Sequence, residues 1–140
     1  MTPKFRVWNE KTESFIDYGD LMLDLKNGKV YSGDVGIPEY TIDVTNQVIL
    51  MQYTGCRDKN GIEIYEGDVI KDKYDKTWLV QWYVGAFVIT NKIPDSDGQT
   101  TTYSHFSNMS NHHFYFEVIG SMWENPELLE VVEWEKSQVK

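Results

Sequence analysis

The chain of 140 residues carries 13 Lys and Arg against 22 Asp and Glu, and this net charge of −9 disfavours binding to duplex nucleic acid, whose phosphates must be neutralised. A hydrophobic content of 41% with 14% aromatic residues is typical of a folded globular protein and excludes a disordered chain. The absence of a long apolar run, of an apolar signal segment and of a second cysteine predicts a cytoplasmic protein with no membrane partner and no internal disulfide.

Residues 1–47 are predicted to form a small N-terminal β lobe. Phe5–Trp8 and Ser14–Tyr18 have the composition of two short strands joined by a polar turn, which together make a hairpin. Leu21–Leu25 alternates with the period of two that marks a half-buried strand, although Leu and Met are also good helix formers. Asn27-Gly28 is a strong turn signal, because both residues tolerate a positive φ.

The segment Ser32–Asn46 is predicted to be an irregular connector at the boundary between this lobe and the rest of the chain. It contains Gly33, Gly36 and Pro38 and shows no sustained apolar period. We therefore place the domain boundary after residue 47.

Residues 48–125 are predicted to form the main β domain. Val48–Met51 is a continuous apolar run that we expect to end at Thr54-Gly55. Two turns follow, around Gly61 and around Gly67, and each glycine follows polar turn residues. We expect at least one of these two glycines to adopt a positive φ.

The later part of this domain alternates clearly between strands and turns. Trp78, Val80 and Trp82 share one face of a strand, Phe87–Thr90 forms another run, and Phe114–Gly120 alternates as the last strand. About five short strands separated by turn residues predict a small β sandwich or barrel, and barrel closure would hide the strand edges.

Two segments remain beside the predicted strands. The polar stretch 91–113 is predicted to be a long loop, which in a compact domain is usually functional or disordered. Residues 126–140 form an acidic tail, where Asn125-Pro126 could start a helix as far as Glu135, but an extended strand fits its composition equally well.

Metal and cofactor sites are not predicted. His112 and His113 are adjacent, so on a strand they would point to opposite faces, and His105 lies seven residues earlier. The Asp-rich turns lack the ligand spacing of a calcium loop.

No catalytic constellation is recognisable, and we expect the protein not to be an enzyme. The alternative is a small hydrolase that uses Cys56, or His105 or His113 with a carboxylate; Cys56 would need a nearby His and a lowered pKa. Clustering of these groups in one pocket would favour that alternative.

The aromatic residues indicate a possible interaction surface instead. The five candidates are Trp78, Trp82, Trp123, Tyr65 and Tyr83. Surface aromatics form ligand grooves on small barrels, but the same residues could also fill a core or an oligomer interface. We expect the chain to bind a protein partner or to associate with itself as a homo-oligomer.

Nucleic acid is not expected as a partner, single-stranded or double-stranded. Lys71, Lys73 and Lys76 form the one local group of cations near the predicted aromatic surface, but aspartates interleave with them and the local charge is near zero.

Four segments together resemble the YopX family of phage and prophage proteins. They are Phe5-Arg6-Val7-Trp8, Met51–Gly61, Ile64–Ile70 and Val118–Leu129. The resemblance implies an SH3-type β-barrel or roll encoded by a mobile element or its bacterial host. It implies no biochemical activity and no catalytic residues, because the family has none assigned. The function expected is that of a non-enzymatic interaction or assembly module.

Overall fold

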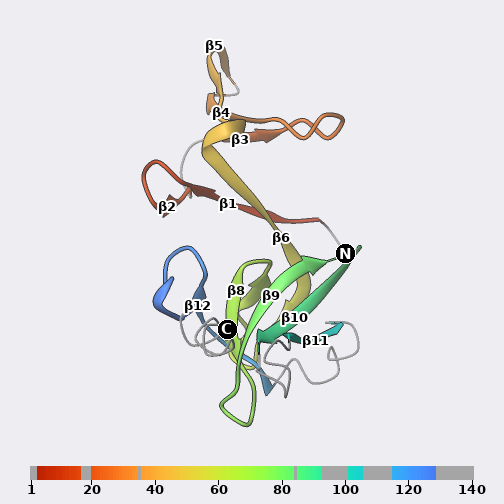
Figure 1. The fold of residues 1–140 in the computed structure, drawn as a ribbon. Coiled ribbons are helices and arrows are strands. Elements are labelled where there is room, and N and C mark those ends of the chain that lie inside the picture. Colours follow the sequence, from red (N-terminus) through yellow and green to blue (C-terminus); the bar gives the residue numbers. More distant parts are fainter. Residues whose placement is uncertain are drawn as a thin grey trace. The chain divides into compact units, whose positions relative to one another are not determined.

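The computed structural model describes residues 3–16, 20–34, 36–83, 85–92, 101–105 and 115–128. These residues form strands and turns with almost no helix, which confirms the all-β class (Figure 1). The chain divides into two compact units, an N-terminal unit (Arg6–Met51) and a C-terminal unit (Met1–Phe5 with Gln52–Lys140). The sequence placed a boundary after residue 47, whereas the two units divide four residues later, within a strand.

The N-terminal unit begins with the predicted hairpin. Strands β1 (Phe5–Asn9) and β2 (Ser14–Phe15) pair antiparallel, and the rings of Trp8 and Phe15 meet edge to face with centroids 5.0 Å apart. This packing leaves Trp8 only 6% exposed. Strand β3 (Asp20–Leu23) confirms the period-two prediction over the competing helix, and it pairs antiparallel with β4 (Val30–Asp34) across the predicted turn at Gly28.

The predicted connector at residues 32–46 is wrong, because it holds most of β4, all of β5 (Ile37–Asp43) and the start of a 3-10 helix, η1 (Thr45–Gln47). These strands complete a three-stranded sheet in the order β3-β4-β5. A Cβ at Gly33 would lie 2.7 Å from the Cα of Thr41, so glycine is needed where the two backbones approach. Gly33 contributed to the prediction of a loop, but the structure needs a glycine there because two strands of a sheet approach closely.

Strand β5 is bulged opposite this glycine. Its register with β4 runs from Ser32↔Ile42 to Asp34↔Ile37, so three residues of β4 lie opposite six residues of β5. Such a bulge disrupts the ladder locally while the strand continues. This irregular pairing hides the apolar alternation that sequence reasoning depends on.

The C-terminal unit contains the remaining strands, and one of them begins in the N-terminal unit. They are β6 (Val48–Arg57), β7 (Glu63–Tyr65), β8 (Asp68–Lys71), β9 (Thr77–Tyr83), β10 (Ala86–Lys92), β11 (Thr101–His105) and β12 (Glu117–Ser121). Strand β6 does not end at Thr54-Gly55 as predicted. Gly55 has a φ of 88° and the register with β7 shifts between Tyr53 and Arg57, so the glycine bends the strand without ending it.

Five of these strands form one antiparallel sheet in the order β11-β10-β9-β8-β12, which curls into an open half-barrel (Figure 1). Strand β11 lies within the predicted loop 91–113, and it pairs with β10 from Val88↔His105 to Lys92↔Thr101. The loop prediction is therefore wrong for residues 101–105, because Thr and Tyr there continue the sheet. Residues 93–100 and 106–113 lie outside the described residues.

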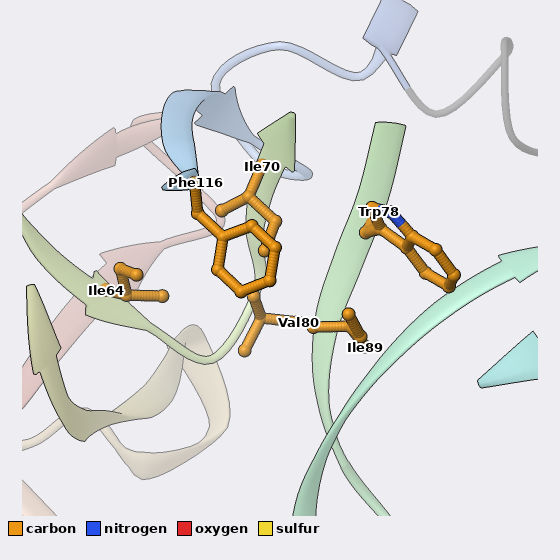
Figure 2. Packing of buried hydrophobic residues seen from close by; sticks show 6 residues of the cluster. All are labelled: Ile64, Ile70, Trp78, Val80, Ile89 and Phe116. Atoms are coloured by element: carbon orange, nitrogen blue, oxygen red, sulfur yellow. The ribbon is translucent and has the colours of Figure 1, made fainter. Parts of the chain in front are cut away.

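The core of the C-terminal unit lies against the curled sheet (Figure 2). Its cluster comprises Ile64, Ile70, Trp78, Val80, Ile89 and Phe116, all at most 7% exposed. These residues come from β7, β8, β9 and β10 and from the residue that precedes β12. Burial of such side chains stabilises a fold by about 1.5–3 kcal/mol each, so this cluster is the main source of the unit's stability.

The turns around the core match the sequence prediction. Gly61 has a φ of 82° and Gly67 a φ of 87°, so both glycines adopt the left-handed conformation. The chain becomes helical at Glu127 and Leu128, and the rest of the predicted helix or strand lies outside the described residues. The part of the chain that the structure describes includes no helix with the length and apolar character to cross a membrane.

Candidate interaction surface

Of the predicted aromatic surface residues, Trp78 belongs to the core. Its side chain is 7% exposed, and its indole Nε1 donates a hydrogen bond to Asp72 Oδ2 at 3.0 Å. Trp82, on the same strand, is 50% exposed and packs edge to face against Phe87 with ring centroids 4.9 Å apart. Strand alternation alone places both tryptophans on one face, but the core covers only the first part of β9.

The other predicted aromatic residues come from different elements. Tyr65 is half-buried in β7, stacks at a tilt on Tyr53 with centroids 5.4 Å apart, and donates a hydrogen bond to Glu63 at 3.5 Å. Trp123 is half-buried after β12, and the side chain of Tyr83 lies outside the described residues. Among the predicted aromatic residues whose side chains are described, Trp82 is thus the most exposed.

The carboxylate of Asp58, in the central turn, is buried and has a structural role. Its Oδ1 accepts the backbone N–H groups of Asn60 and Ile62 at 2.8 and 2.9 Å, and its Oδ2 accepts that of Val118 at 2.9 Å. Asp58 is only 5% exposed. One side chain therefore closes the turn and ties it to β12, so it is not a free acid or base.

The polar side chains of the other motif segments are also engaged with the backbone. Asp68 is 1% exposed and accepts the backbone N–H of Tyr65 at 2.7 Å, while its own strand continues into the core. Ser121 and Asn125 close the turn after β12: Ser121 Oγ accepts from Glu124 N at 3.0 Å, and Asn125 Oδ1 accepts from Ser121 N at 3.3 Å. These side chains therefore stabilise turns.

Cys56 has the environment of a structural thiol. It packs against the core cluster, and burial raises the pKa of its thiol above the ordinary value. A raised pKa lowers the fraction of nucleophilic thiolate near neutral pH, which disfavours a cysteine hydrolase. The side chains of His105, His112 and His113 lie outside the described residues. Within the described ranges, no three or more His, Cys, Asp or Glu side chains gather as a metal site would require.

A cavity of about 310 Å³ includes Lys71 and Lys73 of the three lysines that the sequence analysis considered, but not Lys76. It is lined by Lys59, Lys71, Asp72, Lys73, Asp75, Tyr115 and Glu117. Lys59 lies 3.3 Å from the Glu117 carboxylate, and Lys71 lies 4.0 Å from that of Asp75. Three lysines and three carboxylates thus line this cavity, so their formal charges balance.

Sequence reasoning missed the most exposed apolar side chains of a strand. Tyr40 and Ile42 in β5 are 69% and 62% exposed, and Glu39 and Asp43 beside them are also exposed. We call Tyr40 and Ile42 the β5 surface. The alternation in Glu39-Tyr40-Thr41-Ile42-Asp43 could have revealed a strand, but the nearby glycines and proline outweighed it.

On the other face of β5, the Asp43 carboxylate is hydrogen-bonded to Thr45. Asp43 Oδ1 accepts hydrogen bonds from Thr45 Oγ1 at 2.6 Å and from Thr45 N at 2.9 Å. These bonds, the first of them above all, lower the pKa of Asp43 below its usual value, and Lys29 adds to the effect. Successive residues of a strand point to opposite faces, so Tyr40 and Ile42 share one face of β5, and Glu39 and Asp43 belong to the other.

These features define an all-β protein of two compact units whose polar motif residues stabilise turns. The family model of the YopX protein matches residues 4–130. Because this match covers most of the chain, the protein belongs to the YopX family, which confirms the resemblance seen in the sequence.

One solved structure, the crystal structure of protein EF1440 from Enterococcus faecalis, is similar in fold. The TM-score is 0.55, the sequence identity is 23%, and the match covers 93% of this chain and 99% of the other. At this identity the likeness shows the fold alone. No curated protein matches the chain in sequence.

Proposed function

We propose that this YopX-family chain is a non-enzymatic protein-interaction or assembly module that a phage or prophage uses in the bacterial cytoplasm. The observation that carries the proposal is the exposure of Tyr40 and Ile42 on the β5 surface. A single exposed apolar side chain is ordinary in a folded protein. Two large ones within three residues of a strand offer the kind of contact that dominates binding energies at protein interfaces, where tyrosine is enriched.

The state of the motif residues supports the same proposal. Asp58 and Asp68 are the most buried carboxylates of the C-terminal unit's described turns, and both accept backbone hydrogen bonds. A general acid or base needs a titratable group that can reach a substrate, and these carboxylates face the protein's own backbone. Burial raises the pKa of the Cys56 thiol, which lowers its thiolate fraction and disfavours it as a nucleophile.

Within this proposal, the C-terminal unit is a roll of the SH3 type, and it serves as the scaffold of the module. Its curled antiparallel sheet and its single core cluster support that assignment. We also propose that nucleic acid is not a partner, since the chain carries a net charge of −9 and its lysine-lined cavity holds as many carboxylates as lysines. A protein partner or a second copy is the ligand of the module.

Site-specific photo-crosslinking tests this function. A photoreactive phenylalanine analogue replaces Tyr40 in one variant and Tyr74 in the other, and each variant is expressed in cells that encode the protein. Tyr74 is the matched control, because it is an exposed tyrosine of the C-terminal unit at 77% exposure. Mass spectrometry identifies the adducts, and light scattering gives the solution mass of the unmodified protein.

We expect position 40 to give discrete adducts with one protein, either a partner or a second copy, and position 74 to give few. A second copy in the adduct should coincide with a solution mass above that of a monomer at micromolar concentration. Equal and diffuse labelling from both positions, with a monomer in solution, would contradict the proposed function.

A further inference from the structure

Two turns of the C-terminal unit share one hydrogen-bond pattern. In the turn after β6, Asp58 Oδ1 accepts the backbone N–H groups two and four residues later at 2.8 and 2.9 Å. In the turn between β8 and β9, Asp72 Oδ1 accepts the N–H groups at the same two positions, again at 2.8 and 2.9 Å. The residue after each aspartate is a lysine, Lys59 in the first turn and Lys73 in the second, and both line the cavity of about 310 Å³. Two turns of the same type thus each contribute a lysine to one cavity.

Residues at the start of β12 also line this cavity. Phe116 is 1% exposed and belongs to the core, whereas its neighbours Tyr115 and Glu117 line the cavity. The Phe116 carbonyl accepts the backbone N–H of Lys59 at 2.9 Å, which ties the first turn to this segment. Sites for small molecules begin at about 300 Å³, so the cavity is large enough for a small organic ligand.

Two of the three lysines in the cavity are paired with a carboxylate. Lys59 lies 3.3 Å from the Glu117 carboxylate, and Lys71 lies 4.0 Å from that of Asp75. The side chains of Glu117 and Asp75 are 42% and 89% exposed. Exposed ion pairs of this kind contribute little to stability, but each one neutralises its lysine.

The third lysine, Lys73, makes no ion pair with the described residues. Its Nζ lies 4.8 Å from the centroid of the Tyr115 ring and 5.2 Å from that of the Tyr74 ring. The nearby carboxylate of Asp72 accepts from its own turn and from Trp78 Nε1 instead. Ring faces attract an ammonium group without neutralising it, and the group keeps N–H donors for an anion. Lys73 is therefore the cation of the cavity that is positioned but not paired.

We infer that this cavity binds a small organic ligand with one carboxylate, and that the ammonium group of Lys73 is its ion-pair partner. The inference goes beyond the proposed function, because every lining residue belongs to the C-terminal unit and none to the β5 surface. The Tyr115 ring, 41% exposed, offers a contact for an apolar or aromatic body of the ligand.

The carboxylates of the cavity set the charge of this ligand. A single carboxylate matches the one cation that has no carboxylate partner. A phosphate group carries about two negative charges near neutral pH, and it would be repelled by Asp72, Asp75 and Glu117. A monocarboxylate is thus favoured over a phosphate or a polyphosphate.

An NMR titration of the isotope-labelled full chain tests the inference. Sodium benzoate is the probe, because it combines one carboxylate with an aromatic ring. Benzamide, its neutral counterpart, and inorganic phosphate are titrated in parallel at about pH 7.5. Sodium chloride keeps the ionic strength constant, so that general effects of salt cancel.

Three variants separate the contributions of the side chains. Lys73→Gln removes the unpaired cation. Lys76→Gln is its matched control, because Lys76 belongs to the same turn and lies over an aromatic ring, 4.6 Å from the Trp78 centroid, but does not line the cavity. Glu117→Gln removes the carboxylate partner of Lys59.

We expect saturable binding of benzoate with a Kd in the millimolar range or below, and shifts of amide signals in the two turns and at the start of β12. Benzamide and phosphate should bind at least about fivefold more weakly. Lys73→Gln should weaken benzoate binding at least about fivefold, and Lys76→Gln should leave it unchanged. Glu117→Gln should strengthen it at least about twofold, because Lys59 also becomes available to the ligand.

Absence of saturable shifts with benzoate up to about 20 mM would overturn the inference. Equal losses in Lys73→Gln and Lys76→Gln would do so too, because they would show a general attraction to lysines. Benzamide binding as tightly as benzoate would show that the ring and not the charge is recognised. Phosphate binding as tightly would show a site for anions of higher charge, and either result would contradict the assignment of a monocarboxylate. The crosslinking at position 40 tests the proposed function separately.

Discussion

The two units of this protein differ in how far they bury the apolar side chains of their sheets. The curled sheet of the C-terminal unit covers Ile64, Ile70, Val80 and Ile89 completely, at 0% exposure each. The three-stranded sheet of the N-terminal unit buries Val30, but it leaves Tyr40 and Ile42 more than 60% exposed at its edge strand. The first sheet therefore contributes its apolar side chains to a core, whereas the second leaves two large apolar side chains exposed to solvent.

The acidic residues discussed for the two units also differ in burial. Asp58 and Asp68 of the C-terminal unit are buried and accept backbone hydrogen bonds, so they stabilise turns. Glu39 and Asp43 of the N-terminal unit are exposed beside apolar side chains. The segments that identify the family thus include the buried residues that build turns, and the proposed recognition surface lies in a strand outside them.

The largest expected effect is the loss of the Asp58 carboxylate. Asp58→Ala leaves three backbone N–H groups without their acceptor in a buried turn, and we expect it to lower the free energy of unfolding by about 3 kcal/mol. Urea denaturation measures this. Asp75→Asn is the control, because the Asp75 side chain is 89% exposed, and it should change stability by less than about 0.5 kcal/mol. Equal effects of both variants would refute a special role for Asp58.

A smaller loss is expected at Gly67, where the backbone enters β8. Its φ of 87° is unfavourable for a β-branched residue, so Gly67→Val should lower the free energy of unfolding by about 1–3 kcal/mol. Asp75→Gly is the opposite test, because Asp75 has a φ of 63° and glycine relieves that strain. Thermal melting should show a clear decrease for the first variant and no decrease for the second. An unchanged melting temperature for Gly67→Val would contradict the assigned strain.

The sequence predicted features that depend on local chemistry and missed those that depend on packing. Gly61 and Gly67 were recognisable because a turn needs a positive φ at a defined place. Strand β5 was missed because Gly33 serves a close approach between backbones, which no local signal distinguishes from a loop. The exposure of Trp82 beside the buried Trp78 depends on where the core ends along β9, which alternation cannot show.

The β5 surface was missed for the same reason, because its exposure depends on packing. Tyr40 could be recognised as a candidate only after its strand was known, and its exposure depends on the sheet's edge position. The family resemblance did not help, because the family carries no assigned site. Fold class and turns were thus accessible from the sequence, and the candidate surface was not.

A third, more local effect is expected at Gly33. A Cβ there would lie 2.7 Å from Thr41 Cα and 2.8 Å from the Tyr40 carbonyl oxygen, so Gly33→Ala must displace β5 from β4. We expect a loss of about 1 kcal/mol and faster amide hydrogen exchange in β5, with β8–β10 unchanged. Lys26→Ala, at an exposed position of the same unit, is the control. Unaltered exchange in β5 would show that the close approach is not required.

The most direct measurement for the central claim is the stability of the chain without its exposed apolar pair. If Tyr40 and Ile42 serve binding and not folding, Tyr40→Ser with Ile42→Ser should keep the free energy of unfolding within about 0.5 kcal/mol of the unaltered protein in urea denaturation. A loss of about 2 kcal/mol or more, as core truncations give, would instead show that both side chains support the fold and would contradict the account.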